Sequence, residues 1–525
     1  MRTFAQAMNA AAHRTPRWHR AVFWCVLGCS VIDRLLVLIQ FGFQYTGSDD
    51  VIFWNVASDM AKGIFREPFL YGQNYNPALE SLLGVPLLWA GVPLHVAMPL
   101  ITSLLALVPF LSFGLWLLRQ GRPSQAALLV AIPVLLPVEW GLMTTITRGF
   151  VTGIGVLALL PWVQGIRSGA ARDLFTGLLL YAALLTNPNA LLFVVPFALV
   201  MVLTHASPLR RLVRYALGAA PMLLLHLLAL RFYASESDRI VHRMDDWRMG
   251  FHPGELIPEG LAQLDRHFAW TSPLLWPTAS IALAMLALAV VILAKQKQVR
   301  LALSVASAFV IIIVALGFPK IHDGSDHVLF AYSRMFLAMP LLVGWSFILP
   351  TWSAREVRAV AIALVVLAPA FMLGKALIQE RVVATQLAHQ DAAPVREVAY
   401  VQFEQLALAL GAAAQEAGAD LLIGLDLTDS HTHGLLCYGA PATYPTFPPT
   451  LYAGPDRRLW RRRAEADAVH ATVLVLGGDA HHWESLAARG LMVQALQLNG
   501  VTAHVVRNNE LGTDALVTLI KSADR

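Results

Sequence analysis

VIDRLLVLIQFGFQYTGSDDVIFWN, residues 31–55, carries the end of a long apolar segment into two adjacent acids, Asp49 and Asp50. The apolar segment begins near residue 21 and reaches residue 43, which is long enough to cross a hydrocarbon layer of about 30 Å as a helix. It continues well past the point where a secretory signal would be cleaved, so we expect a permanent anchor. The two acids are therefore predicted to lie just outside the membrane, where the first helix ends.

The composition predicts a polytopic α-helical membrane protein. Hydrophobic residues make up 57% of the 525 residues and charged residues only 14%, and the mean hydropathy is +0.58. These values exclude an ordinary soluble chain. Apolar runs separated by short polar breaks predict twelve candidate spans, at residues 21–43, 79–92, 94–118, 125–138, 148–165, 173–186, 190–204, 215–232, 276–294, 301–317, 335–350 and 358–374.

The distribution of charge predicts the orientation in the membrane. One set of connecting segments holds sixteen Lys and Arg residues and only two acids, Asp173 and Glu356, and cationic loops are retained in the cytoplasm. The longer, more acidic loops would lie outside, at residues 44–78, 139–147, 233–275 and 318–334. We therefore expect a multi-pass protein of the cytoplasmic (inner) membrane with its N-terminus in the cytoplasm. The chain has no Asn-x-Ser/Thr sequon, which favours a bacterial membrane.

The number of crossings follows from parity. A cytoplasmic start and an external C-terminal domain require an odd number, whereas twelve spans are predicted. The weakest is 79–92, because it is short and Gly84 and Pro86 interrupt it. About 11–13 transmembrane helices are therefore expected, with eleven favoured over thirteen.

Residues 381–525 are predicted to form a soluble extracytoplasmic α/β domain after a membrane domain at residues 1–380. Apolar strand candidates alternate there with helical stretches, a pattern typical of α/β layers. The strand candidates are ADLLIGLDL (419–427), ATVLVLGG (471–478) and TAHVVR (502–507). The helical candidates are 401–418 and 481–500, and the Pro- and Gly-rich segment 439–463 is predicted to be a long surface loop.

The segment after the two acids, VIFWNVASDMAKGIF (51–65), has a mostly helical spacing of apolar residues. It predicts an amphipathic helix that lies on the outer leaflet. Carboxylates are favoured at the N-terminus of a helix, where unpaired amide groups carry partial positive charge. A structural alternative is therefore open, in which Asp49 merely caps this helix.

The order of features from the first helix to the next resembles that of the GT-C glycosyltransferases, the superfamily of protein O-mannosyltransferases and the aminoarabinose transferases of lipid A. The residues that carry the resemblance are Arg34, Gly47, Asp49, Asp50, Ala57, Gly63, Pro68, Tyr71, Gly72, Tyr75 and Pro77. AYSRMFLAMPLLVG (331–344) is similar to the Arg-Tyr and Pro pattern that begins a late helix of the same superfamily. The two matches bracket roughly 300 residues.

The resemblance implies transfer of a sugar from a polyprenyl-phosphate donor to an acceptor at the outer face of the membrane, usually with inversion. The acceptor would be a lipid, a glycan or a protein, and no nucleic acid partner is expected. A single displacement needs a base for the acceptor's proton. By position, Asp49 matches the first acid of the family and would be this base, while Asp50 replaces the usual Glu and would shape its charge or hold the acceptor.

The departing phosphate needs cations, and here the sequence departs from the family. Asn76 stands before Pro77 where aminoarabinose-type members have a lysine. Arg148, Lys320 and Arg334 are all predicted at the outer interface, and an arginine fork suits two phosphate oxygens. Arg334 is the strongest candidate because it lies within a matched motif, although ordinary anchoring to lipid headgroups is the alternative for each of these residues.

Other clusters give competing site hypotheses. HDGSDH, with His322, Asp323, Asp326 and His327, offers ligand types that a divalent metal accepts, and some members of the superfamily need a metal while others do not. No cofactor is certain from the sequence. Asp245 and Asp246 form a second acid pair, and a further metal hypothesis combines His431, His433, His481 and His482. The run DRRLWRRR (456–463) is either a solvated face or a surface for anionic groups.

Asp33 and Arg34 lie within the first predicted helix, where a charge is costly unless it is paired. Neighbouring positions of a helix point about 100° apart, so the two residues are expected to find different partners and to serve structure. Two rival functions also stay open at this point. One is a transporter or flippase of lipid-linked saccharides, and the other is an oligosaccharide polymerase or ligase.

Overall fold

A computed structural model describes residues 17–239, 250–272, 279–390, 396–425, 430–453, 468–478, 480–488, 490–498, 501–508 and 510–522. The chain divides into two compact units, each built from segments that are distant in sequence. The helical unit comprises residues 1–42, 99–228 and 245–393, and the mixed unit comprises residues 43–98, 229–244 and 394–525. The loop that carries Asp49 and Asp50 therefore belongs to the same unit as the C-terminal residues.

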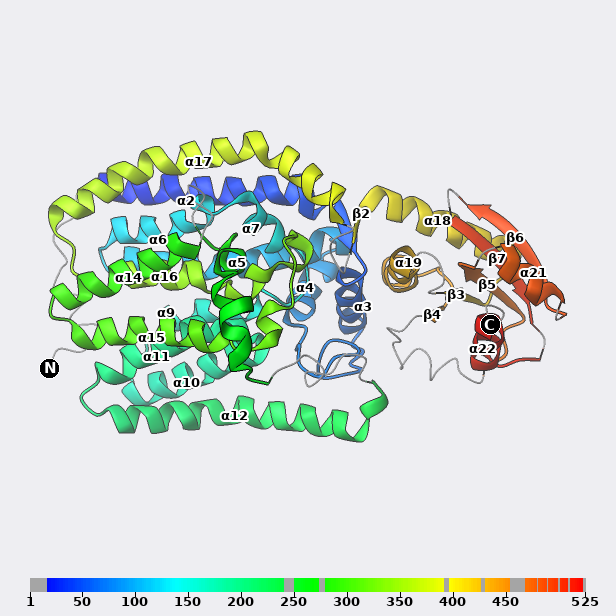
Figure 1. The fold of residues 1–525 in the computed structure, drawn as a ribbon, viewed down its shortest axis with the longest axis horizontal. Helices are drawn as coiled ribbons and strands as arrows, with labels where there is room; N and C mark the ends of the chain where they lie inside the picture. Colours follow the sequence, from blue (N-terminus) through cyan, green and yellow to red (C-terminus); the bar gives the residue numbers. More distant parts are fainter. Residues whose placement is uncertain are drawn as a thin grey trace. The chain divides into compact units, whose positions relative to one another are not determined.

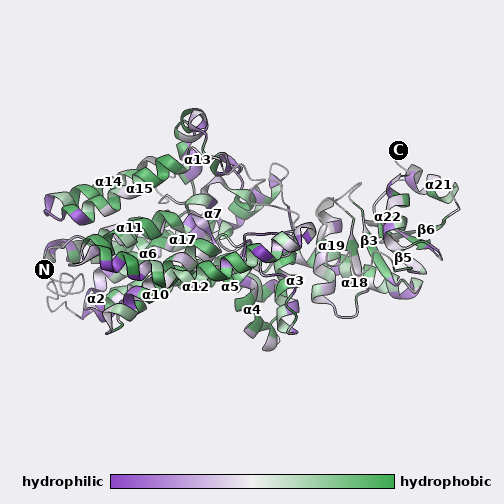
Figure 2. Cartoon of the chain, turned by 90° about the horizontal axis from the view of Figure 1, so that it is seen from below, coloured by the Kyte–Doolittle hydropathy of each residue, from purple (hydrophilic) through white to green (hydrophobic). Residues whose placement is uncertain are grey.

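The helical unit is a bundle whose helices are largely hydrophobic, as the green ribbons of α5 and α14 show (Figure 2). Its helices, two of which extend into the mixed unit, are α2 (Trp18–Val37), α5 (Leu94–Arg119), α6 (Pro123–Leu135), α7 (Val138–Met143), α8 (Thr152–Val156), α9 (Leu160–Val163), α10 (Gly169–Thr186), α11 (Leu191–Leu203), α12 (Pro208–Ser235), α13 (Leu264–Phe268), α14 (Ala279–Lys295), α15 (Val299–Ala315), α16 (Met339–Ile348) and α17 (Ala354–Ala388). The predicted boundary at residue 380 falls inside α17.

Within the described ranges, four helices are long and apolar enough to cross a membrane, namely Trp18–Gly42, Leu94–Arg119, Pro208–Ser235 and Ala354–Ala388. Seven shorter apolar helices accompany them. The predicted span 148–165 is broken into α8, a short 3₁₀ turn and α9. The apolar runs of the sequence thus become helices, several of them too short to cross alone.

Residues 79–92, the weakest of the predicted spans, contain a short helix of the mixed unit. It forms α4 (Leu79–Trp89), whose 11 residues rise about 16 Å at 1.5 Å per residue. Pro86 lies inside it, and Ala78 before it has a positive φ of 50°. This length falls well short of a bilayer core, which agrees with the choice of residues 79–92 as the weakest predicted span. The total of 11–13 crossings remains a prediction.

An ion pair shielded from water joins the first long helix of the helical unit to the last. Lys375 of α17 is fully buried, and its Nζ lies 2.7 Å from the Asp33 carboxylate of α2. The two helices run side by side (Figure 1). Asp33 has thus found a partner 342 residues away.

Arg34, the neighbour of Asp33, turns to a different helix. Its guanidinium donates to the carbonyl of Gly141 at 3.0 Å and to the hydroxyls of Thr144 and Thr145 at 3.0 and 3.1 Å. It also lies 4.8 Å from the ring centre of Trp140. The expectation that Asp33 and Arg34 have different partners and a structural role is therefore confirmed.

The mixed unit contains a five-stranded sheet and a two-stranded one. Its elements are β1 (Tyr45–Gly47), α3 (Asp50–Ala61), α4, β2 (Glu397–Ala399), α18 (Tyr400–Ala417), β3 (Leu421–Gly424), α19 (Ser430–Thr443), β4 (Thr450–Tyr452), β5 (Thr472–Leu476), α21 (Ala480–Ala488), β6 (Met492–Leu498), β7 (Val501–Arg507) and α22 (Thr513–Lys521). The larger sheet has the order β4-β3-β5-β7-β6. β3 is parallel to β4 and β5, while β7 is antiparallel to β5 and β6.

Helices cover both faces of this sheet, because alternate strand residues point to opposite sides. Leu422 and Leu474 pack in one core with Phe403 of α18. Their neighbours Leu421 and Val473 pack in another core that contains side chains of α21 and α22. The predicted α/β domain is thereby confirmed, and the three strand candidates correspond to β3, β5 and β7.

Two local predictions in this region were wrong. Residues 492–498, expected to continue a helix, form β6, which pairs with β7 from Leu498 opposite Val501. Asn499-Gly500, which separates these strands in sequence, is a dipeptide typical of a hairpin. The expected loop 439–463 begins inside α19, which runs to Thr443 around Pro441, and it also contains β4. Packing against the rest of the domain outweighs the local preference of these residues.

The ion pair of α2 and α17 can be tested by charge removal. Replacing Lys375 by Leu leaves the Asp33 carboxylate buried without its partner, so we expect a loss of about 3–5 kcal/mol in the free energy of unfolding. The double variant Asp33→Asn/Lys375→Leu removes both charges and should recover most of the stability. Thermal unfolding of the purified protein in detergent measures both effects. A melting temperature of Lys375→Leu equal to that of the wild type would contradict the prediction.

Candidate functional site

The two acids that follow the first helix lie in the turn that leads from a strand into a helix, with Asp49 just before α3 and Asp50 as its first residue. β1 pairs antiparallel with β2, so that Gly47 lies opposite Glu397. The backbone amide of Tyr400 also donates to the carbonyl of Gln44 at 2.7 Å. This pairing holds the start of the loop to residues at least 350 positions later, and α3 begins three residues after β1 ends.

Asp50 and Asp49 have different surroundings within this turn. Asp50 is 7% exposed and accepts a hydrogen bond from the amide of Gly47 at 3.1 Å. Asp49 is half-buried, and its backbone already has helical angles of −74° and −38°. Capping residues normally have extended angles, and accordingly the Asp49 side chain forms no capping bond. The hypothesis that Asp49 merely caps the helix is therefore not supported.

A third carboxylate, which the sequence patterns did not predict, lies beside this turn. Glu397 of β2 is 3% exposed, and a Cβ placed on Gly47 would come within 2.7 Å of its Oε1. The backbone of Gly47 thus lies between the carboxylates of Asp50 and Glu397. Only glycine permits this approach. Glu397 could not be found from local patterns, because its contact with Gly47 depends on strand pairing across the chain.

α3 is a buried helix, which makes the prediction of an amphipathic helix on the outer leaflet wrong. All eight residues from Asp50 to Ala57 are buried. The amide side chain of Asn55 donates to the carbonyl of Tyr438 in α19 at 2.6 Å, and the hydroxyl of Ser81 in α4 donates to the carbonyl of Phe53 at 2.9 Å. Four consecutive apolar residues, 51–54, cover every side of the helix, which is typical of a buried helix.

The rest of the loop is held by two further acids. Asp59 accepts from Arg66 at 2.7 Å and from the hydroxyl of Tyr71 at 2.8 Å. Burial, reinforced by the Asp59 charge, raises the pKa of the Tyr71 hydroxyl well above its usual range. Glu67 accepts from the amide of Gly72 at 3.3 Å and from the hydroxyl of Tyr233 at 3.1 Å. Two residues of the GT-C pattern, Tyr71 and Gly72, therefore shape the loop.

Arg334 and Arg148, both in the helical unit, are buried and converge on the segment 323–331. Arg334 is 3% exposed and donates to the carbonyls of Phe330 and Ala331 at 2.9 and 2.8 Å and to that of Asp323. Its guanidinium lies 3.8 Å from the ring centre of Phe330. Arg148 donates to the carbonyl of Leu329.

These acceptors orient the Arg334 guanidinium without neutralising it. Each is a carbonyl, and no ion pair joins Arg334 to an acid of the described chain, although the Asp323 carboxylate acts on it from farther away. A guanidinium that keeps its full charge inside protein attracts an anion strongly, because the surroundings screen little. Arg334 thus has the electrostatic property that a phosphate group requires.

Lys320 differs from the two arginines. Its Nζ forms an ion pair of 2.7 Å with Asp323. Burial lowers the pKa of Lys320, although the Asp323 carboxylate opposes this shift. Part of its charge is therefore already compensated, which makes it the least suitable of the three predicted phosphate ligands.

The side chains of HDGSDH do not converge as a metal site. His322 contacts His267 at 3.1 Å, and Asp326 accepts two hydrogen bonds from Arg266 at 2.6 and 2.8 Å. His327 contacts the carbonyl of Gln386. In the described ranges, no group of three or more His, Cys, Asp or Glu side chains is arranged to hold a metal ion.

The other sequence hypotheses are only partly covered by the structure. His433 contacts the carbonyl of Leu425 at 2.7 Å, and His482 packs on Trp483. The side chains of His431 and His481 lie outside the description. So do Asp245 and Asp246 and the basic run 456–463.

Gly47 offers a test of the packing around the acids. Gly47→Ala would force a Cβ against Glu397 Oε1, at 2.7 Å, and the carbonyl of Arg396, at 2.8 Å. We expect a loss of about 1–3 kcal/mol in the free energy of unfolding, measured by thermal or denaturant unfolding. Gly28→Ala in α2 is the matched control, since its Cβ would meet nothing within 4 Å, and it should be neutral or stabilising. Equal stability of the two variants would contradict the arrangement.

Comparison with known proteins identifies the fold. Neither the protein-family models nor the curated proteins gave a match. The solved structures did: ArnT from Cupriavidus metallidurans bound to undecaprenyl phosphate matches with a TM-score of 0.55 and 13% identity, over 92% of this chain and 97% of that one. Its apo form matches with the same score and identity, over 93% and 98%. The chain therefore has the fold of ArnT, with apolar helices and a C-terminal α/β domain as the sequence predicted.

Proposed function

We propose that this protein is a membrane glycosyltransferase that takes a sugar from a polyprenyl-phosphate donor and transfers it to an acceptor at the outer face of the cytoplasmic membrane. The observation that carries the proposal is the fold shared along 92% of the chain with a structure bound to undecaprenyl phosphate. The multi-pass helical character and the apolar surface of the chain agree with a donor that lies in the bilayer.

Asp49 is proposed as the general base. Its carboxylate would take the proton of the acceptor while the acceptor oxygen attacks the anomeric carbon. The bond from that carbon to the phosphate oxygen breaks in the same step, and polyprenyl phosphate leaves with the electron pair, so a single displacement inverts the configuration. Asp50, bonded to Gly47, would hold the turn that presents Asp49, which also agrees with the greater exposure of Asp49.

Arg334 and Arg148 are proposed to bind the donor phosphate. Both are buried side chains oriented by backbone carbonyls, and no acid of the described chain forms an ion pair with Arg334. A fork of guanidinium N–H groups can meet two phosphate oxygens at once. Lys320 would contribute at longer range, because it shares its charge with Asp323.

Asp49→Asn tests the base. The amide keeps the size of the side chain but cannot accept the proton, so we expect the rate of sugar transfer to fall at least about 10²-fold while the melting temperature is retained. The assay incubates purified protein in detergent with polyprenyl-phosphate sugars and candidate acceptors.

Glu416→Gln serves as the control for that assay, because it alters an exposed carboxylate of α18 outside the proposed site and should leave the rate unchanged. Unchanged transfer by Asp49→Asn would assign the base elsewhere. Movement of a lipid-linked saccharide across vesicles without a new glycosidic bond would select the flippase alternative, and joining of saccharide chains would select a polymerase or ligase.

Arg334→Lys tests the phosphate site. Lysine keeps the positive charge but loses the paired donors of the fork, so we expect affinity for undecaprenyl phosphate to fall about 10-fold, a loss of about 1.4 kcal/mol. Binding is measured by the ligand-dependent rise in melting temperature. The exposed Arg266→Lys is the control and should bind like the wild type. Wild-type affinity of Arg334→Lys would exclude a paired contact with phosphate.

A further inference from the structure

A cavity of about 500 Å³ opens in the helical unit where α6 and α15 begin and where the chain passes from α16 to α17. α16 separates it from Arg334, which precedes that helix, whereas the cavity includes residues 349–352 that follow it. It therefore lies at the end of the unit that is predicted to face the cytoplasm. Among the residues that the structure describes, three cations line it, Arg122, Lys297 and Arg300, and no acid does.

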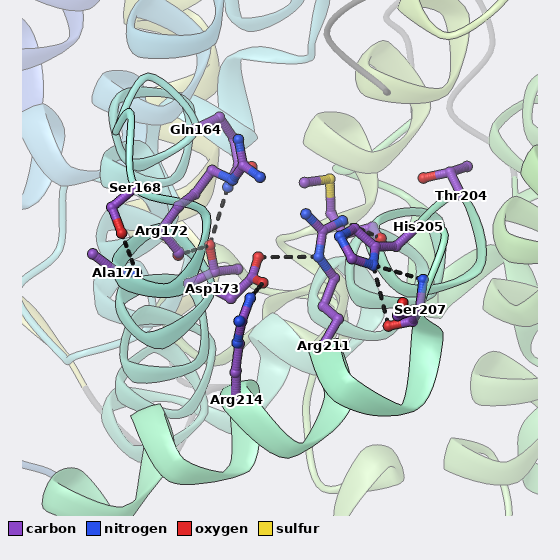
Figure 3. Close-up of polar contacts among 12 residues, drawn as sticks. Gln164, Ser168, Ala171, Arg172, Asp173, Thr204, His205, Ser207, Arg211 and Arg214 are labelled. Atoms are coloured by element: carbon purple, nitrogen blue, oxygen red, sulfur yellow. Dashed lines mark hydrogen bonds and ion pairs between the residues drawn. The ribbon is translucent and has the colours of Figure 1, made fainter. Parts of the chain in front are cut away.

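The two acids of the predicted cytoplasmic segments are already engaged elsewhere. Asp173 of α10 accepts from Arg211 at 3.0 Å and from Arg214 at 3.2 Å, both on α12 (Figure 3). The Glu356 carboxylate accepts from the backbone amide of Ser353 at 2.6 Å, and the backbone amide of Glu356 donates to the Ser353 hydroxyl at 3.3 Å, which forms a capping box at the start of α17. Neither carboxylate forms an ion pair with Arg122, Lys297 or Arg300 in the described structure.

Neutral groups orient two of these cations. Arg122 donates to the carbonyl of Ile348 at 2.5 Å and to the side chain of Gln125. Its third nitrogen, Nη1, is shielded from solvent and has no hydrogen-bond partner among the residues described. Arg300 donates to the carbonyl of Leu203 at 2.9 Å. Such acceptors fix the direction of a guanidinium and leave its charge available.

The third cation sits on a loop that is fixed in place. The side chain of Gln296 donates to the carbonyl of Thr351 at 2.8 Å and accepts from its amide at 2.9 Å, which ties the α14–α15 loop to the segment before α17. Lys297 follows with a positive φ of 59°. Glycine adopts this conformation more easily than lysine does. The backbone conformation therefore does not explain why this position holds a lysine.

The remaining wall of the cavity combines hydroxyls with apolar surface. Ser124 and Thr351 supply hydroxyl groups, while Leu301, Leu349 and Trp352 supply apolar contacts. Pockets for small ligands have this character, with a few convergent polar groups in a mainly apolar wall. Three cations without a counter-charge select an anion, and guanidinium groups suit phosphate oxygens.

We propose that this cavity binds a phosphate ester, either as the headgroup of a membrane phospholipid or as a free phosphorylated molecule. The phosphate would lie among Arg122, Lys297 and Arg300, with the attached apolar part against Trp352 and Leu349. This site is distinct from Arg334 and does not depend on the proposed sugar transfer.

The test measures binding of three probes to the purified full-length protein in detergent by their effect on the melting temperature. The probes are dioctanoyl phosphatidic acid, dioctanoyl phosphatidylcholine and inorganic phosphate. The variant Lys297→Gln/Arg300→Gln removes two exposed cations, so the fold should be retained, as an unchanged melting temperature without probe would verify. Lys295→Gln is the matched control, because Lys295 is exposed near the same loop and does not line the cavity.

We expect phosphatidic acid to bind the wild type and the control saturably, and the double variant at least about 10-fold more weakly. Stabilisation by inorganic phosphate as well, lost in the same variant, would identify a free phosphate as sufficient, whereas stabilisation by phosphatidic acid alone would identify the lipid headgroup. The proposal is overturned if neither phosphate probe binds the wild type, if the double variant binds like the wild type, if Lys295→Gln loses as much affinity, or if phosphatidylcholine binds equally well.

Discussion

Burial of charge is the constraint on which the helical unit depends. Asp33 and Lys375 are both shielded from water, and each would be costly there without the other. Their contact fixes the first long helix against the last, and Arg34 ties the same helix to α7 through a carbonyl and two hydroxyls. In the mixed unit, the strands β1 and β2, which follow these two long helices in the sequence, are paired as well. Segments near the beginning and the end of the membrane-embedded sequence are thus joined twice, by the Asp33–Lys375 ion pair and by the pairing of β1 with β2.

Several acids and the cations proposed to bind ligands have different kinds of hydrogen-bond partner in the described structure. Several acids are engaged by donors, Asp173 by two arginines and Asp59 by an arginine and a tyrosine. The cations proposed to bind ligands, Arg334 and Arg122, are held by neutral acceptors instead. A guanidinium that is oriented but not neutralised is prepared for an incoming anion, because it needs little rearrangement on binding. Arg334 shows this arrangement just before α16, and Arg122 shows it at the other end of α16, where it donates to the carbonyl of Ile348.

Sequence patterns predicted those features that depend on nearby residues or on the general cost of burying a charge. The strands β3, β5 and β7 and the divergent partners of Asp33 and Arg34 are of this kind. Glu397 was missed because only long-range strand pairing brings it beside Gly47. The burial of α3 was missed because α19 and α4 cover it, and neither is close in sequence. β6 was taken for a helix because its alternating pattern is short and follows a true helical stretch.

The pairing of Tyr45–Gly47 with Glu397–Ala399 also governs when the first loop can mature. A ribosome must synthesise some 350 further residues before β1 meets its partner, and α3 waits still longer for α19. Contacts so distant in sequence form late, since closing the intervening chain carries an entropic cost. A nascent or truncated chain therefore carries its acid pair in an unfinished loop, and the loop proposed to hold the base is complete only once the C-terminal domain has been made.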